Sequence, residues 1–165
     1  MNQKPLRPNA GIIVFNSSKL VLAGERLDTP NYWQLPQGGI DPGEQPAEAA
    51  IRELYEEMGL RMPQPDMELE HWLSYEFNGP VNEGLDDYRG QTQKWFLYYW
   101  HGDAAHLDLK THQQEFSRVE WKELSFLATQ IVHFKRSVYQ QLVETALPMM
   151  DHFLHQKGIE YTPAT

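Results

Sequence analysis

Three glutamates, Glu53, Glu56 and Glu57, lie close together in the segment "AEAAIRELYEEMGL", which follows a stretch rich in glycine and proline. At the helical angle of about 100° per residue, all three fall on one side of a helix. Carboxylates without matching cations repel one another, but hard divalent ions such as Mg²⁺ and Mn²⁺ prefer them as ligands. Because Mg²⁺ commonly joins a few carboxylates to substrate phosphates, this spacing indicates the hydrolysis of phosphoanhydride bonds.

A simpler interpretation of the same spacing is a solvated charged face on a surface helix. The opposite side of this helix is apolar and consists of Ala47, Ile51, Leu54, Tyr55 and Met58. Two neighbouring features favour a metal site instead. Gly38, Gly39 and Gly43 permit a loop that folds tightly over a ligand. Arg52 lies four residues before Glu56, where it can pair with that acid and hold its carboxylate in place.

The segment resembles the Nudix hydrolase signature at every fixed position. The matching residues, at the spacing of that signature, are Gly38, Glu44, Arg52-Glu53-Leu54, Glu56-Glu57 and Gly59-Leu60. The resemblance implies an α/β fold, the Nudix α/β/α sandwich with a mixed β-sheet. It also implies divalent-metal-dependent hydrolysis of a nucleoside diphosphate linked to another group, with Mg²⁺ or Mn²⁺ as the cofactor.

The resemblance assigns roles to individual residues of the signature. The three glutamates would supply metal ligands and the catalytic base, and Arg52 would belong with them to the catalytic set. The carbonyl oxygen of Gly38 would be a further metal ligand. Glu44, together with Arg52, would support the loop and the helix.

Segments outside the signature narrow the resemblance to one branch of the family. They are "RPNAGIIVFN", "WQLPQGGIDPGE", "QKWFLYYW", "EFSRVEW" and "FKRSVY". These segments look like those of the bacterial RNA pyrophosphohydrolases and of the plant-type diadenosine tetraphosphate hydrolases. The similarity extends from about Leu6 to Leu147.

By analogy with those enzymes, the substrate's phosphates would contact three cations, Arg26, Lys94 and Lys135. Tyr75 would lie beside the phosphates, Trp33 would line the substrate pocket, and Glu115 would be a further metal ligand or base. Each of these residues also has an ordinary structural interpretation. Lysines are common on exposed strands and helices, aromatic residues are common in cores, and acids are common in loops.

The elements that must position these residues can be outlined from the sequence. Strands are expected in "AGIIVFN", "LVLAGE", "LEHWLSYEF", "QTQKWFLYYW" and "FSRVEWKEL", with a hairpin turn at residues 16–19. Helices are expected from about Pro46 to Met58, ended by Gly59, and in "IVHFKRSVYQQLVETAL". Residues 28–39 should be irregular, and residues 78–90 should form a long exposed loop. The expected organisation is one Nudix hydrolase domain at 6–149 and a C-terminal tail at 150–165.

Composition restricts the class of protein. The chain has 165 residues, a formal net charge of −9 and no cysteine. The absence of cysteine excludes disulfides, thiolate metal sites and a cysteine nucleophile. The negative charge argues against a broad electrostatic contact with nucleic acid, which needs many Lys and Arg residues. No apolar run reaches the roughly 18 residues of a membrane span, and the start lacks the apolar stretch of a signal peptide, so we expect a cytoplasmic protein.

The function expected from the sequence is removal of pyrophosphate from the 5′ end of triphosphorylated RNA. The alternative is hydrolysis of dinucleoside polyphosphates such as diadenosine tetraphosphate, because a similar cleft can accept a second nucleoside. A third possibility is a Nudix-like sensor that binds a nucleotide without cleaving it, although the signature acids are all present here. The expected partner is therefore 5′-triphosphorylated RNA or a dinucleoside polyphosphate, and protein partners stay open.

Overall fold

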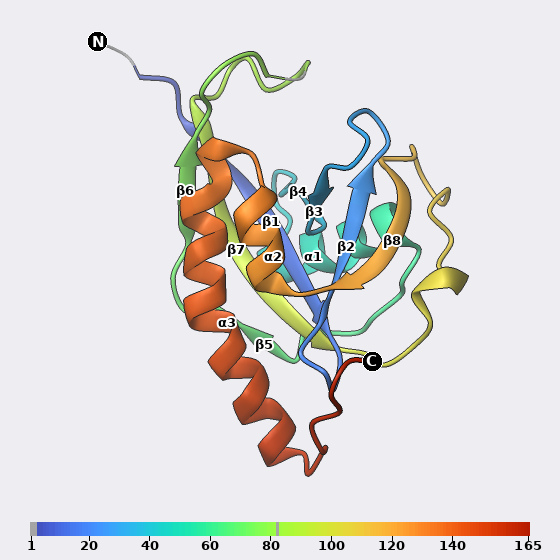
Figure 1. The fold of residues 1–165 in the computed structure, drawn as a ribbon. Coiled ribbons are helices and arrows are strands. Elements are labelled where there is room, and N and C mark those ends of the chain that lie inside the picture. Colours follow the sequence, from blue (N-terminus) through green and yellow to red (C-terminus); the bar gives the residue numbers. More distant parts are fainter. Residues whose placement is uncertain (1–2, 82) are drawn as a thin grey trace.

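A mixed β-sheet separates one helix from two others in this computed structural model, which describes residues 3–81 and 83–165 (Figure 1). The first strand shows how the sequence produces the layers. Ile12 and Val14 pack on the side of the first helix, whereas Ile13 and Phe15 pack on the side of the other two. Alternate residues of a strand point to opposite faces, so a run that is apolar throughout predicts burial on both faces. The expected α/β/α sandwich is confirmed.

The sheet is built around two long strands. Its strands are β1 (Leu6–Phe15), β2 (Val21–Arg26), β3 (Trp33–Gln34), β4 (Gln37–Gly39), β5 (Met67–Glu68), β6 (Leu73–Glu76), β7 (Gly90–Tyr99) and β8 (Phe116–Lys122). β1 pairs with β7 in parallel along its whole length, and with β2 and β4 in antiparallel orientation. β3 and β8 extend the sheet from β2, and β5 and β6 extend it from β7.

The expected strands are present, and the differences concern short elements, among them β5, which was not predicted. Residues 28–39, expected to be irregular, contain the short strands β3 and β4. A segment rich in Pro and Gly shows no strand pattern from which they could have been predicted. In "LEHWLSYEF" only residues 73–76 form a strand, and Leu69 donates its main-chain N–H to the carbonyl of Trp95 just beyond the end of β5. The loop that follows β6 is long, as expected, and includes Leu85, which reaches the cavities described below.

The helices are α1 (Pro46–Met58), α2 (Leu124–Gln130) and α3 (Arg136–Gln156), with short 3₁₀ segments η1 (Ala104–His106) and η2 (His133–Lys135). α1 has the expected bounds. Glu48 accepts a hydrogen bond from the main-chain N–H of Gln45, which begins the helix with a capping box. Gly59 ends it at φ +70°, a conformation that favours glycine.

The polar and apolar sides of α1 differ from the expected division. Glu57 is buried, with 3% of its surface exposed, and lies on the sheet-facing side with Ala50 and Leu54. Ile51 and Tyr55, expected in the core, are only half-buried. A helical wheel shows which residues share a face of the helix. In this segment Ala and Glu residues occur close together around the helix, so the wheel does not show which face packs on the sheet.

The C-terminal helix begins later and ends later than expected. α2 and η2 occupy the start of the segment, and α3 starts only at Arg136. α3 then continues past residue 149, so the segment set apart as a tail begins inside a helix. Phe153 packs edge-on against Phe15, with ring centroids 5.5 Å apart. After α3 the chain returns to the β1–β2 hairpin, where the main-chain N–H of Thr162 donates to the carbonyl of Ser17.

Within residues 3–81 and 83–165, the helices are all too short or too polar to cross a membrane.

The packing of α3 generates a stability prediction. Phe153→Ala should lower the free energy of unfolding by about 3–4 kcal/mol, because it removes a buried ring and leaves a cavity. His152→Ala, at the exposed neighbouring position, should change it by less than about 0.5 kcal/mol. Urea denaturation of the three proteins measures both values. Equal, small effects would mean that the end of α3 is not part of the folded core.

Candidate active site

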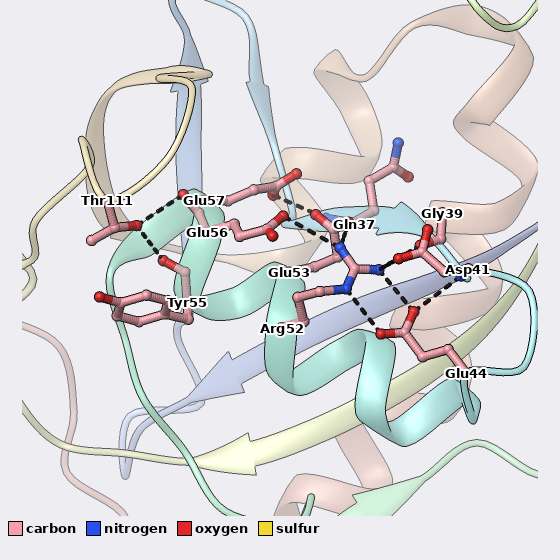
Figure 2. A network of polar contacts seen from close by, with 10 residues as sticks. All are labelled: Gln37, Gly39, Asp41, Glu44, Arg52, Glu53, Tyr55, Glu56, Glu57 and Thr111. Atoms are coloured by element: carbon pink, nitrogen blue, oxygen red, sulfur yellow. Dashed lines mark hydrogen bonds and ion pairs between the residues drawn. The ribbon is translucent and has the colours of Figure 1, made fainter.

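Arg52 connects the loop before α1 to the acids on the helix. Its Nε and Nη2 atoms donate to the two carboxylate oxygens of Glu44, each at 2.9 Å, and Nη2 also donates to the carbonyl of Gly39 at 2.8 Å. Its Nη1 atom donates to Glu53 at 2.7 Å and to Glu56 at 3.3 Å (Figure 2). One guanidinium therefore holds the loop and two of the three helix acids in a fixed arrangement.

Gly38 allows the loop to approach Glu53 closely. A Cβ atom at residue 38 would lie 1.9 Å from the carboxylate carbon of Glu53, so any other residue here would displace that carboxylate. The carboxylate is largely desolvated, and this burial raises the pKa of Glu53 to about 7. The hydrogen bond from Arg52 acts in the opposite direction, whereas the neighbouring charge of Glu56 raises the pKa further.

Glu57 lies deeper than the other two acids. Its carboxylate accepts a hydrogen bond of 3.1 Å from the main-chain N–H of Gln37. Burial, followed by the proximity of Glu115, raises the pKa of Glu57 well above the ordinary value. Glu115 comes from the segment before β8 and is placed there by its main-chain carbonyl, which accepts from the N–H of Leu27. The fold thus brings Glu115 to the helix acids, as the sequence analysis expected.

Two adjoining cavities open beside these acids. The first has a volume of about 460 Å³ and is lined by Gly38, Glu53 and Glu115, together with Arg7 and Asn9. The second has a volume of about 390 Å³ and is lined partly by apolar and aromatic side chains. The residues common to both are Arg26, Asp28, Gln34, Gln37, Leu85 and Gln91. A ligand that reaches from the acids into the second cavity must therefore pass Arg26.

The second cavity combines a buried cation with aromatic rings. Lys135 is 8% exposed, and burial lowers its pKa to about 8, with the charge of Arg26 acting in the same direction. Its Nζ atom lies 5.6 Å from the centroid of the Tyr75 ring. Tyr75 in turn stacks on Phe134, with centroids 5.7 Å apart. A buried ammonium beside aromatic faces is a site for an anionic group attached to a flat apolar one.

Arg26 is paired with a residue that the sequence analysis did not single out. Asp28 accepts two hydrogen bonds from its guanidinium, at 2.8 and 2.6 Å, and these raise the pKa of Arg26. Both residues line both cavities. The spacing of an acid two residues after a cation is too common in sequences to have indicated this pair.

Comparison with known proteins identifies the family. The NUDIX domain pattern matches residues 5–142. The chain belongs to the Nudix family. An RNA pyrophosphohydrolase of Brucella anthropi is 44% identical over 153 residues, which cover 84% of this chain and 88% of that protein.

Solved structures share the Nudix fold at low sequence identity. The MutT protein of Methanosarcina mazei superimposes with a TM-score of 0.65 and 18% identity, over 87% of this chain and 97% of that one. A Caenorhabditis elegans Ap4A hydrolase, solved as a binary complex, has a TM-score of 0.60 and 19% identity, over 85% and 98% of the two chains. At these identities the likeness concerns the fold alone.

The residues of the Nudix signature suit a divalent cation. The donors are carboxylate oxygens, which hard ions prefer, and the close approach of Gly38 to Glu53 brings the main chain of the loop beside a carboxylate. Burial and mutual repulsion raise the pKa of two of these acids, and a cation would relieve both. Within the described residues no three acids are already gathered at metal-binding distance, and Arg52 supplies the positive charge between Glu53 and Glu56.

Two residues expected at the substrate lie elsewhere. Lys94 points to the other face of β7 from Gln93, and its ammonium donates to the main-chain carbonyls of Leu69 and Glu70. Trp33 is buried in the core on the α3 side and lines neither cavity; Lys122 lies over its ring, 4.4 Å from the centroid. The structure therefore brings Arg26, Lys135 and Tyr75 to the cavities but not these two.

The burial of Lys135 generates a prediction about stability and pH. Lys135→Met should stabilise the protein by roughly 1–3 kcal/mol at pH 7, because it removes a buried charge while keeping the side-chain volume. Between the folded pKa of about 8 and the ordinary value of 10.5, the unfolded chain holds a proton that the folded chain has lost. Wild-type stability therefore rises across this window, and the advantage of the variant should shrink.

Urea denaturation at pH 7 and pH 9.5, without phosphate or metal, measures this difference. Arg136→Met, an exposed neighbour, is the control and should show no pH-dependent difference from wild type. An advantage for Lys135→Met that is absent, or constant between the two pH values, would contradict the burial of a titrating ammonium.

Proposed function

We propose that this Nudix protein is an RNA pyrophosphohydrolase, which removes pyrophosphate from the 5′ end of triphosphorylated RNA and leaves a 5′-monophosphate. The observation that carries the proposal is the pair of adjoining cavities, one lined by Glu53 and Glu115 and the other by Lys135 and aromatic rings. The 44% identity to the Brucella anthropi RNA pyrophosphohydrolase, over most of both chains, supports it. The cofactor would be Mg²⁺ or Mn²⁺, and the protein would act in the cytoplasm.

The chain's own residues would hold the substrate at both ends. Arg26, at the junction of the cavities, and Lys135, in the second cavity, would donate to oxygens of the phosphate chain. Phe134 would stack on a base near the 5′ end, and Tyr75 would lie beside the phosphates. Only a few contacts are involved, which suits a negatively charged protein that reads the end of an RNA rather than a duplex.

The acids of α1 would prepare the attack of water on phosphorus. Glu53, Glu56 and Glu57, with the carbonyl of Gly38 and Glu115, would hold the divalent ion. When bound, that ion supplies positive charge to the phosphates and favours the loss of a proton from water. A carboxylate of this set would accept the proton, and Arg52 would keep the carboxylates in position.

A second candidate function is hydrolysis of dinucleoside polyphosphates such as diadenosine tetraphosphate. The observation that favours it is the aromatic part of the second cavity, formed by Tyr75, Phe77 and Phe134. These rings can stack on the base of a second nucleoside as well as on a base of RNA. A sensor that binds without cleavage is less well supported, because the signature acids are all present and buried or paired.

The proposed function predicts a metal-dependent preference for RNA. With Mg²⁺ or Mn²⁺ the protein should release pyrophosphate from triphosphorylated RNA faster than it cleaves diadenosine tetraphosphate, at equal subsaturating concentrations. Excess chelator should abolish both activities. Glu56→Gln should lower turnover at least ~100-fold, because the amide keeps the volume but loses charge and basicity. Initial rates of pyrophosphate and nucleotide release measure these effects.

Glu48→Gln is the matched control for this experiment. Glu48 lies on the same helix but caps its first turn, and glutamine can replace glutamate in a capping box, so activity should be kept. Faster cleavage of the dinucleotide would assign the site to the second candidate function. Unchanged rates in chelator would contradict the metal site.

The two buried or half-buried lysines provide a second test. Lys135→Met should lower kcat/KM for triphosphorylated RNA by roughly 10- to 100-fold, the usual value of one hydrogen bond to a charged group. Lys94→Met should change it less than about 3-fold, because Lys94 binds main-chain carbonyls outside both cavities. Steady-state rates with both variants decide the assignment. The reverse result would place the substrate over the other face of β7.

A further inference from the structure

Two three-residue segments form one wall of the first cavity. Residues 26–28 end β2 and begin the loop to β3, and residues 113–115 lead into β8. All six residues line that cavity. A main-chain hydrogen bond of 2.9 Å joins the two segments, from the N–H of Leu27 to the carbonyl of Glu115. Arg26 and Glu115 belong to different segments, so their relative position depends on how the two segments are held together.

Glu25 lies immediately behind this wall. β2 and β8 lie side by side in the sheet, with Glu25 opposite Arg118 (Figure 1). The register shifts at the next position, where Arg26 pairs with Phe116, so Ser117 is an extra residue and forms a β-bulge. Bulges bend a strand and change the direction of its side chains. Glu25 is only 8% exposed, and it lines neither cavity.

The carboxylate of Glu25 joins the loop between β2 and β3 to the start of β8. Its Oε2 atom accepts a hydrogen bond of 2.7 Å from the main-chain N–H of Asn31. Its Oε1 atom accepts from the Nε atom of Arg118 at 2.8 Å and from the hydroxyl of Ser117 at 3.3 Å. A single side chain outside the cavities thus contacts a residue just beyond each half of the wall.

Asn31 shows why the loop needs this contact. Its φ is +67°, in the left-handed region that most residues other than glycine avoid. The hydrogen bond from its N–H to a largely buried carboxylate stabilises this conformation. The next residue, Tyr32, returns the chain to β2, because its carbonyl accepts from the N–H of Arg26 at 2.8 Å. The bond at Asn31 therefore bears on the course of the loop next to Arg26.

The ion pair with Arg118 does not by itself account for the burial of Glu25. The Arg118 side chain is 56% exposed, and pairs with an exposed partner contribute little to stability. A carboxylate is costly to remove from water unless hydrogen bonds compensate for the loss. Here the compensating donors include Asn31 of the loop and Ser117 of the bulge, which are the two groups that connect the halves of the wall.

We propose that Glu25 is a positioning residue, which holds the β2–β3 loop against the start of β8 and thereby keeps Arg26 and Glu115 in place in the wall of the first cavity. This inference rests on the proposed function in so far as Arg26 and Glu115 act on a phosphate chain. Glu25 touches no ligand and acts only through the wall.

Three variants test the proposal by activity. Glu25→Met keeps the side-chain volume but removes both acceptor oxygens, and it should lower kcat/KM for triphosphorylated RNA roughly 5- to 20-fold. Glu25→Gln keeps an oxygen for Asn31 and an amide that can donate to Ser117, so it should stay within about 3-fold of wild type. Arg118→Met, which removes only the ion pair, should do the same.

Two activity results would overturn the proposal. If Glu25→Met costs less than about 2-fold, the wall does not depend on the carboxylate. If Arg118→Met or Glu25→Gln costs as much as Glu25→Met, the ion pair carries the effect rather than the contacts with the loop and the bulge.

Amide hydrogen exchange without substrate separates this inference from the proposed function. In Glu25→Met the N–H groups of Leu27 and Asn31 should both exchange at least about 10-fold faster than in wild type, because the loop is released from β8. The N–H of Leu69, which donates to Trp95 at the opposite edge of the sheet, should exchange as before. NMR spectra recorded after transfer to D₂O measure all three rates.

Faster exchange of Asn31 alone would overturn the proposal, because the carboxylate would then hold only its own partner. Equal acceleration of Leu69 would also overturn it, since the variant would be generally less stable. If Glu25→Met does not fold, the wild type still decides, because exchange of its Asn31 N–H at the rate of an unstructured peptide would contradict the contact. If the protein hydrolyses neither substrate, the proposed function fails while the exchange result still stands.

Discussion

The site depends on the contacts of a single guanidinium with carboxylates that the fold has partly removed from water. Desolvation disfavours each of these charges, and Glu53 and Glu57 both have raised pKa values as a result. Arg52 offsets part of this by donating to three acids and a main-chain carbonyl at once. A lysine has no planar fork and could not join the loop and the helix in the same way. The loop before α1 and α1 itself are therefore one structural unit.

The sequence predicts this unit well because its determinants are local. Helix spacing, the capping residues and Gly59 lie within a few residues of one another and place α1 correctly. The burial of Glu57 is not local, since it depends on which side of the helix meets the sheet. The different positions of Lys94 and Lys135 follow from strand alternation and from a 3₁₀ turn, and neither feature shows in the composition of the segments. The hydrogen bonds of Gln93 with Asn9 and Gln37 depend on pairings between distant segments, which a single sequence does not reveal. The pair of Arg26 and Asp28 is local, but an acid two residues after a cation is too common a spacing to indicate it.

The two cavities separate charges that would otherwise neutralise each other. Glu53 and Glu115 line one cavity, Lys135 lines the other, and Arg26 at the junction already has a carboxylate partner in Asp28. Neutral amides, Gln34, Gln37 and Gln91, occupy the wall between. Amides can donate or accept without adding charge, so they leave the acids free for a cation and the cations free for an anion.

This separation also explains how a protein with a net charge of −9 can bind a polyanion. Long-range attraction would need an excess of positive charge over a wide surface, and the chain does not have it. Binding must instead come from short-range contacts with desolvated groups, which are stronger in a buried site than in water. In the proposed function the buried Lys135 would make such a contact, at the expense of stability in the free protein. A substrate with several linked phosphates can satisfy the cation-binding acids and the buried lysine together, whereas a single phosphate can reach only one of them.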